Sequence, residues 1–140
     1  GLDENNNHDM RIFSMALLLS SYFLYNSVGS IDENALNSLS LVVNLTKHIQ
    51  FKSGDSNSKD DAEDLAQIFP SFMWVVRDFA LQLVDEEENE ISSRDYLERA
   101  LLEKGASADP KNDIRKHLKL FFKDRECCTM IRPLTNEEEL

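Results

Sequence analysis

The feature that most constrains the fold of this chain is a run of five apolar residues, Phe72–Val76 (FMWVV), which ends abruptly at Arg77 and Asp78. A strand that does not alternate apolar with polar side chains is covered on both faces, which is typical of a central strand in a parallel sheet. The run is far shorter than the roughly 18 apolar residues of a membrane-spanning helix. The pattern therefore predicts a buried central strand in a globular domain.

Two other segments have the composition of strands, and helical patterns lie between all three. The stretch Ser21–Val28 (SYFLYNSV) is rich in aromatic residues and is closed by Gly29, and Cys127–Ile131 (CCTMI) is stopped by Arg132-Pro133. Strands that alternate with helices indicate an α/β fold with a mostly parallel sheet flanked by helices. The helices are expected from Asp9, from about Ile31 to Gln50, from Ala62 to Phe69, from Ser92 and from Asp109, after a polar loop at Gly1–His8.

Local patterns predict where these helices begin and which side chains they bury. Ser30 precedes Glu33 by three residues, which is the spacing of a capping box, and Ser92 and Asp95 cap a later helix. Asp109-Pro110 is a further helix start, with Asp as N-cap and Pro at the first helical position. The expected apolar bands are Ile12, Phe13, Met15, Ala16 and Leu19 in the first helix and Ile114, His117, Leu118, Phe121 and Phe122 in the last.

The charge balance and the scarcity of ligand residues exclude several classes of function. The chain has 15 basic and 26 acidic residues and a net charge of −11, so we expect no nucleic-acid partner, because binding phosphates needs clustered Lys and Arg. The three histidines are far apart and the two cysteines are adjacent, so neither set has metal-ligand spacing. The four glycines allow neither a G-x-G-x-x-G nor a G-x-x-x-x-G-K-[ST] phosphate loop. We therefore predict no metal site and no catalytic residue in this chain.

The two adjacent cysteines also bear on the compartment. Cys127 and Cys128 do not make a disulfide framework, and no signal-peptide pattern is visible, which favours a reducing, cytoplasmic setting. On a strand the two side chains would point to opposite faces. We expect buried, structural thiols.

Ligands of open α/β sheets bind outside the carboxyl ends of the strands, and three such ends are predicted here: Asn26-Ser27, Arg77-Asp78 and Arg132-Pro133. The second is the most informative. The carboxylate of Asp78 could accept hydrogen bonds from a ligand edge with two adjacent N–H donors, as guanine has, and the planar guanidinium of Arg77 could stack beside a flat base. The alternative is a local Arg–Asp ion pair that caps the sheet, and geometry alone does not favour either.

A family resemblance favours the first alternative. The segment Phe69–Phe79 (FPSFMWVVRDF) resembles the guanine-specificity segment of the guanylate-binding proteins, which are large dynamin-like GTPases, with an Arg-Asp pair in place of the N/T-K-x-D of small GTPases. The resemblance spreads over nearly the whole chain, in the right order. It includes Leu18-Leu19-Ser20-Ser21 through Phe23, Tyr25-Asn26-Ser27 and Gly29, then Ser93–Glu98, Asn112–Arg115, Asp124–Cys127 and Arg132-Pro133-Leu134.

The resemblance implies a role for each matching residue. Asp78 would accept hydrogen bonds from the guanine N1–H and exocyclic amine, and Arg77 would flank the base or its loop. Arg132-Pro133 would begin the loop that closes over the base. Gly1, with Leu2, matches the end of the family's D-T-E-G-L switch motif, whose glycine N–H faces the γ-phosphate.

The resemblance also implies which parts would be supplied by sequence preceding Gly1. These are the phosphate loop with its lysine, the Mg²⁺-binding hydroxyl, the switch threonine and the family's catalytic arginine, on which phosphoryl transfer depends. Residues 1–140 would therefore be the C-terminal part of a Ras-like P-loop G domain that binds and hydrolyses GTP with Mg²⁺, and the isolated chain is expected to be inactive. The family further implies homodimers through the G domains and a cytoplasmic location, with association to internal membranes in some members.

Two alternatives remain open at this stage. One is an acidic α/β protein-interaction module that binds no nucleotide, and the other is an atlastin-like membrane-fusion GTPase, which shares the Arg-Asp pair. A G-x-x-x-x-G-K-[ST] pattern upstream of Gly1 would support the enzyme, and an initiator Met directly before Gly1 would support the module. The F-P-x-F-x-W context and the Arg125-Glu126-Cys127 segment favour the guanylate-binding proteins over the atlastins.

Overall fold

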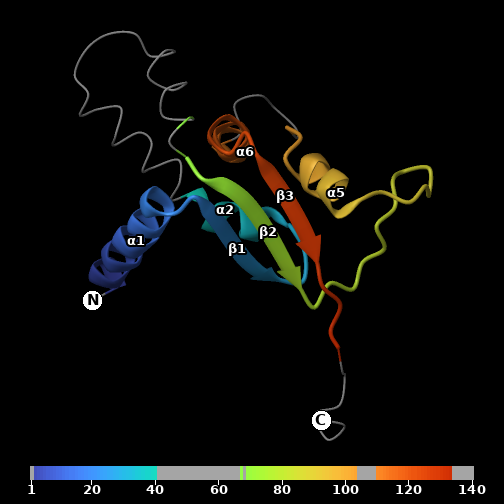
Figure 1. The fold of residues 1–140 in the computed structure, drawn as a ribbon. Coiled ribbons are helices and arrows are strands. Elements are labelled where there is room, and N and C mark those ends of the chain that lie inside the picture. Colours follow the sequence, from blue (N-terminus) through green and yellow to red (C-terminus); the bar gives the residue numbers. More distant parts are fainter. Residues whose placement is uncertain (1, 41–66, 68, 104–109, 134–140) are drawn as a thin grey trace, which may run out of the picture.

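Among the residues that the structure describes, the fold is a three-stranded parallel sheet with helices packed against it (Figure 1). The computed structural model describes residues 2–40, 67, 69–103 and 110–133. The strands lie in the order β1 (Tyr22–Val28), β2 (Ser71–Arg77) and β3 (Arg125–Thr129), and the described helices are α1 (Leu2–Leu19), α2 (Glu33–Ser38), α5 (Ser93–Ala100) and α6 (Pro110–Phe121). The predicted α/β fold with a parallel sheet flanked by helices is confirmed.

The apolar run forms the central strand, as predicted. β2 pairs in parallel with β1 on one side and with β3 on the other. Its side chains differ between the two faces of the sheet, however, because Phe72, Trp74 and Val76 are buried whereas Met73 and Val75 are only half-buried. The expected cover is thus complete on one face only, among the residues that the structure describes.

The core lies on the first of these faces, where side chains from α1, α2, α5 and α6 meet the sheet. Aromatic rings connect the strands and helices there: Phe23 packs on Phe72 with ring centroids 6.3 Å apart, and Phe72 packs on Phe122 at 4.6 Å. The buried apolar cluster comprises Leu17, Ile31, Leu36, Leu39, Phe72, Trp74, Val76, Phe79, Leu97, Leu101, Ile114, Leu118 and Phe122. Burial of this cluster is the main force that holds the helices against the sheet.

The first helix corrects two expectations. α1 begins at Leu2, so the segment from Leu2 to His8 is helical and not a loop. No Gly or Pro interrupts this segment, and the low helix propensity of asparagine costs only a few tenths of a kcal/mol per residue. The expected apolar band is confirmed at Phe13, which packs against the core, and wrong for Met15 and Leu19, which are 62% and 80% exposed. The fully buried residue of α1 is Leu17, which lies outside the expected band.

The other helix starts are mostly as predicted. The N-cap of α2 is Asp32, whose Oδ1 accepts a hydrogen bond from the Ala35 N–H at 2.8 Å, so the expected cap at Ser30 is wrong. Ser92 and Asp95 form a complete capping box at α5, as predicted. α6 begins at Pro110, also as predicted, while its expected N-cap lies outside the described residues. Most of the helices expected over 31–50 and 62–69 lie outside them too.

The last strand begins two residues earlier than predicted. β3 runs from Arg125 to Thr129, and Met130 and Ile131 are exposed beyond it. A charged residue can start this strand because the Arg125 guanidinium donates to both carboxylate oxygens of Glu98, at 2.7 and 2.8 Å. Cys127 packs against the core and Cys128 is exposed, so the prediction of opposite faces is confirmed and the expected burial of both thiols is wrong for Cys128.

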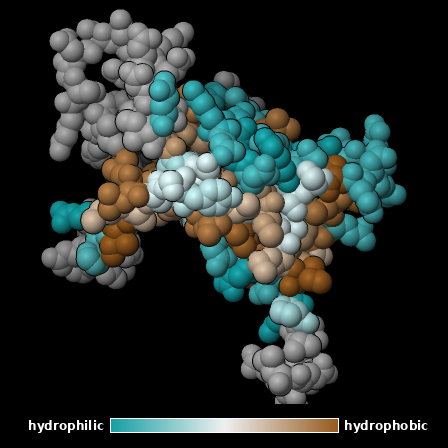
Figure 2. Space-filling model, in the orientation of Figure 1, coloured by the Kyte–Doolittle hydropathy of each residue, from teal (hydrophilic) through white to brown (hydrophobic). Residues whose placement is uncertain are grey.

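The second face of the sheet and the outer side of α1 carry apolar side chains that the described residues do not cover. Leu24 is 61% exposed and Val28 is 58% exposed on β1. Figure 2 shows hydrophobic surface over α1 and over the sheet. In the described part of the chain, every helix is too short or too polar to cross a membrane.

Candidate functional site

The carboxyl ends of the strands meet at one edge of the sheet, where the three predicted strand ends lie. Two hydrogen bonds join the backbone of β2 to its neighbours there: the Gly29 N–H donates to the Arg77 carbonyl, and the Met130 N–H donates to the Val76 carbonyl, both at 2.8 Å. The Phe79 N–H then donates to the Met130 carbonyl at 2.9 Å. The backbone on both sides of Asp78 is therefore fixed by the strands next to it.

Asp78 occupies an unusual backbone conformation at this edge. Its φ angle is +53°, in the left-handed region that Asp tolerates better than most residues. The turn buries the next residue, Phe79, while Asp78 itself is exposed. Among the described residues, no hydrogen bond or ion pair involves the Asp78 carboxylate. The carboxylate is thus available to a ligand at the carboxyl end of the central strand.

Arg77 has a partner on the neighbouring strand. Its Nε donates a hydrogen bond to Oδ1 of Asn26 on β1 at 2.9 Å. Within the part of the chain that the structure describes, no ion pair joins Arg77 to Asp78, so the alternative of a sheet-capping pair between them is not found. Asn26 was expected only as a strand end and as part of a motif. Predicting the contact between Asn26 and Arg77 would have required the register of the parallel strands, which cannot be read from a single sequence.

The opposite face of the same two strands carries a second set of contacts. The Trp74 Nε1–H donates to the Ser27 hydroxyl at 2.9 Å, and the Tyr25 and Trp74 rings pack edge to face with centroids 5.2 Å apart. Burial raises the pKa of the Tyr25 phenol, partly offset by a hydrogen bond with Ser38. The two segments that carry the family resemblance in β1 and β2 therefore contact each other through side chains on both faces of the sheet.

The loop after β1 and the helix α5 are fixed around this edge. Gly29 has a φ of +89°, which a glycine adopts without strain. The Ile31 N–H donates to the Tyr96 hydroxyl on α5 at 2.9 Å. At the other side, the Ser93 and Thr129 hydroxyls lie 3.0 Å apart and join α5 to the end of β3. The ends of β1 and β3 are therefore both joined to α5 by hydrogen bonds.

The remaining predicted site residues are Arg132, Pro133 and Gly1. Arg132 and Pro133 follow β3 and are exposed, two and three residues after the Met130 that pairs beside Asp78. Gly1, the predicted γ-phosphate residue, lies outside the described residues. The structure thus brings Arg77 and Asp78 to the same edge as the end of β3, and among the described residues no hydrogen bond or ion pair joins Arg132 or Pro133 to them.

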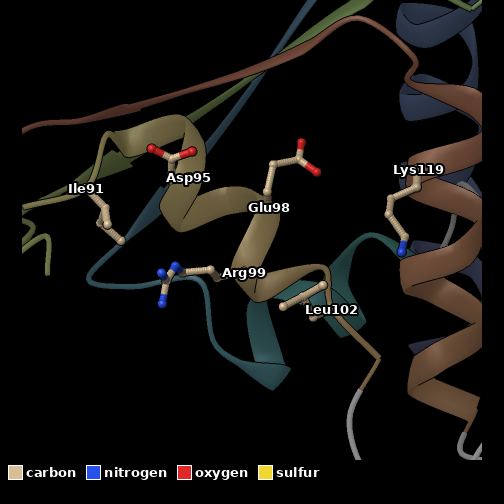
Figure 3. Close-up of a pocket in the computed structure, with 6 residues that line it drawn as sticks. All are labelled: Ile91, Asp95, Glu98, Arg99, Leu102 and Lys119. Carbon is tan, nitrogen blue, oxygen red and sulfur yellow. The ribbon is translucent and has the colours of Figure 1, made fainter. Parts of the chain in front are cut away.

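A hollow of about 430 Å³ lies elsewhere, between α5 and α6 (Figure 3). Its charged groups serve the fold: Asp95 belongs to the capping box, which lowers the pKa of its carboxyl through hydrogen bonds with Ser92, and Glu98 binds Arg125. None of the predicted site residues lines it; the lining residues are Ile91, Asp95, Glu98, Arg99, Leu102 and Lys119. Across the described ranges, no three His, Cys, Asp or Glu side chains are grouped so that they could hold a metal ion.

The fold and the polar strand ends define the class of protein. A parallel sheet flanked by helices, with polar side chains after its central strand, is the arrangement that binds ligands at the carboxyl edge, and it is consistent with part of a Ras-like G domain.

Comparison with known proteins gives the family. Residues 2–140 match the model of the guanylate-binding protein N-terminal domain. The chain is 44% identical over 128 residues to guanylate-binding protein 2 of Homo sapiens, covering 88% of this chain and 21% of that protein. It is 38% identical over 138 residues to guanylate-binding protein 2 of Mus musculus, covering 96% of this chain and 23% of that protein. This chain belongs to the guanylate-binding protein family, and it spans about a fifth of the length of these relatives.

Proposed function

We propose that this chain is the guanine-recognition part of a large GTPase that binds and hydrolyses GTP. The observation that carries the proposal is the Asp78 carboxylate, which is exposed at the carboxyl end of the central strand without a described partner. Membership of the guanylate-binding protein family and the names of its relatives support guanine nucleotides as the ligand.

The chemistry of the site follows from hydrogen-bond geometry. An ionised carboxylate offers two acceptor oxygens, and guanine presents two adjacent donors, its N1–H and its exocyclic amine. Adenine presents no such pair, so Asp78 would be left unsatisfied beside it. A site built around a buried or oriented hydrogen bond discriminates strongly against a ligand that lacks the donor.

The phosphate chemistry would come from outside residues 1–140. Within the proposal, Arg77 flanks the base, Arg132-Pro133 begins the loop that closes over it, and Gly1 faces the γ-phosphate. The phosphate loop and Mg²⁺ ligands precede Gly1, so that the isolated chain has no turnover. We further propose a cytoplasmic protein that dimerises through its G domains and associates with internal membranes.

The test is an Asp78→Asn variant of the gene product that carries this sequence, compared with Asp113→Asn as a control at an exposed aspartate on α6. We expect Asp78→Asn to weaken GDP binding about 10- to 100-fold, because the Asn amide keeps one acceptor oxygen and places an NH₂ donor opposite the second guanine donor. The same variant should bind xanthosine diphosphate more tightly than the wild type does, because the Asn amide can donate to the C2 oxygen of xanthine. Titration calorimetry with GDP, ADP and xanthosine diphosphate gives all three affinities.

Two results would contradict the proposal. The first is wild-type protein that binds GDP no more tightly than ADP. The second is an Asp78→Asn variant with unchanged GDP affinity and no gain for xanthosine diphosphate. The first would favour the alternative of a protein-interaction module, and the second would show that Asp78 does not recognise the base.

A further inference from the structure

The Asn26 side chain lies beside the proposed base-recognition pair without belonging to it. In the parallel register of β1 and β2, Asn26 is opposite Val75 and Val28 is opposite Arg77. Asn26 and Arg77 therefore point to the same face of the sheet, one diagonal step apart, because alternate residues of a strand share a face. This placement brings Oδ1 of Asn26 within 2.9 Å of Nε of Arg77.

The position of this bond on the guanidinium matters. Arginine is a long side chain with many rotamers, and Arg77 is exposed. Nε is the guanidinium nitrogen closest to the backbone, so a bond there restricts the terminal torsions and fixes the plane of the group. Among the described residues, the two Nη groups have no hydrogen-bond or ion-pair partner. Such an arrangement holds the guanidinium ready to stack on a flat base or to donate to a ligand.

The chemistry of the partner matters as well. Asp78 follows Arg77 directly and carries the opposite charge, so an ion pair between the two is the obvious competitor for the guanidinium. Asn26 engages Arg77 through a neutral oxygen, and within the described residues the Asp78 carboxylate is left unpaired. The amide thus orients the arginine and keeps it from occupying the acceptor atoms that a base would need.

We infer that Asn26 is a positioning residue that sets affinity and selectivity for the guanine base by orienting Arg77 away from Asp78. The inference rests on the proposed function, because it names the residue that prepares the same site. By contrast, the Ser27 hydroxyl that receives the Trp74 N–H lies on the packed face and serves the fold.

A double-mutant cycle on the gene product tests the inference. The variants are Asn26→Ala, Arg77→Ala, the double variant, Asn26→Asp, and Asn34→Ala as a matched control at an exposed asparagine on α2. We expect Asn26→Ala to weaken GDP binding about threefold to tenfold, the size of one hydrogen bond between exposed groups. In the Arg77→Ala background the same change should have no further effect, because Asn26 acts through the arginine.

The conservative variant and the control separate positioning from a structural role. Asn26→Asp keeps an acceptor for Nε and should retain GDP affinity within about twofold, while Asn34→Ala should be unchanged. Binding of ADP and the thermal unfolding midpoint serve as readouts that a change in fold would move and the loss of base positioning would not.

Three outcomes would overturn the inference: unchanged GDP affinity in Asn26→Ala, an equal loss with and without Arg77, or an equal loss of GDP and ADP affinity. The Asp78→Asn variant separates failure of this inference from failure of the proposed function. If Asp78→Asn loses GDP binding while Asn26→Ala does not, the inference fails and the proposed function stands. If the wild type does not prefer GDP to ADP, both fail.

Discussion

The two faces of this sheet differ although the same strands build both. On the packed face, Phe72, Trp74 and Val76 are buried under helices, and a hydrogen bond and ring contacts join β1 to β2. On the open face the alternate residues of β1 and β2 are half-buried or exposed, and a hydrogen bond between Asn26 and Arg77 joins the two strands. The packed face thus supplies most of the stability, and the open face contributes the side chains of the candidate site.

The largest effect should come from the centre of the packed face. Trp74 is fully buried, and Trp74→Ala removes its ring contacts and its hydrogen bond to Ser27 and leaves a cavity. We expect the free energy of unfolding to fall by about 3–5 kcal/mol. Val75→Ala, on the half-buried positions of the same strand, is the matched control and should cost clearly less. Urea unfolding followed by circular dichroism measures both, and equal losses would contradict the difference between the faces.

Cys127 and Cys128 are adjacent on β3 but lie on opposite faces of the sheet, so their reactivities compare the two faces directly. Burial raises the pKa of the Cys127 thiol to about 12, with smaller contributions from Cys128 and Glu126, whereas Cys128 is exposed. We therefore expect iodoacetamide at pH 8 to label Cys128 at least about tenfold faster than Cys127, because the thiolate is the reactive form. Mass spectrometry of the labelled peptide, with a Cys128→Ser control, measures the two rates. Equal rates in the folded protein would contradict the packed position of Cys127.

The raised pKa of the Cys127 thiol also predicts how the free energy of unfolding changes with pH. The folded state disfavours the Cys127 thiolate, so that between the unfolded pKa near 9 and the folded value of about 12 the unfolded chain binds fewer protons than the folded chain does. Stability from this group is therefore complete below about pH 9 and is lost as the pH rises above it. A Cys127→Ala variant should show a weaker decline of the unfolding midpoint between pH 8 and pH 10.

The smallest effect should come from the open face. Leu24→Ser replaces a side chain that is 61% exposed, so we expect a change within about 0.5 kcal/mol in the free energy of unfolding of the 140-residue chain. The exposed apolar side chains should make this chain self-associate despite its charge of −11, and Leu24→Ser should reduce that association. Sedimentation velocity measures it, with Asn34→Ser as a polar control. A monomeric wild-type chain with one sharp unfolding transition would contradict this prediction.

Much of the fold was predictable because local patterns are strong here. The central strand followed from an uninterrupted apolar run, and the α5 cap followed from Ser92 and Asp95. The errors fell where local patterns compete with packing. Ile12 and Met15 fit an apolar helical band, yet α1 buries Leu17, because the face of a helix that is buried depends on where the sheet lies.

The candidate site divides in the same way. Arg77 and Asp78 could be placed at a strand end from sequence, because parallel strands present their carboxyl ends at one edge. The partner of Arg77 could not, because the contact with Asn26 joins residues 51 positions apart and depends on register.

The sequence by itself determined the order of strands and helices, the position of the central strand and the family of the protein, since these depend on residue types that are adjacent or regularly spaced along the chain. Only the tertiary structure decided the left-handed turn at Asp78, the bond that orients Arg77 and the burial of Arg115, which is 1% exposed and pairs with Glu33 across α2 and α6. The physical reason is that burial, hydrogen-bond partners and local electrostatics belong to pairs of distant residues, and such pairs exist only after the chain has folded.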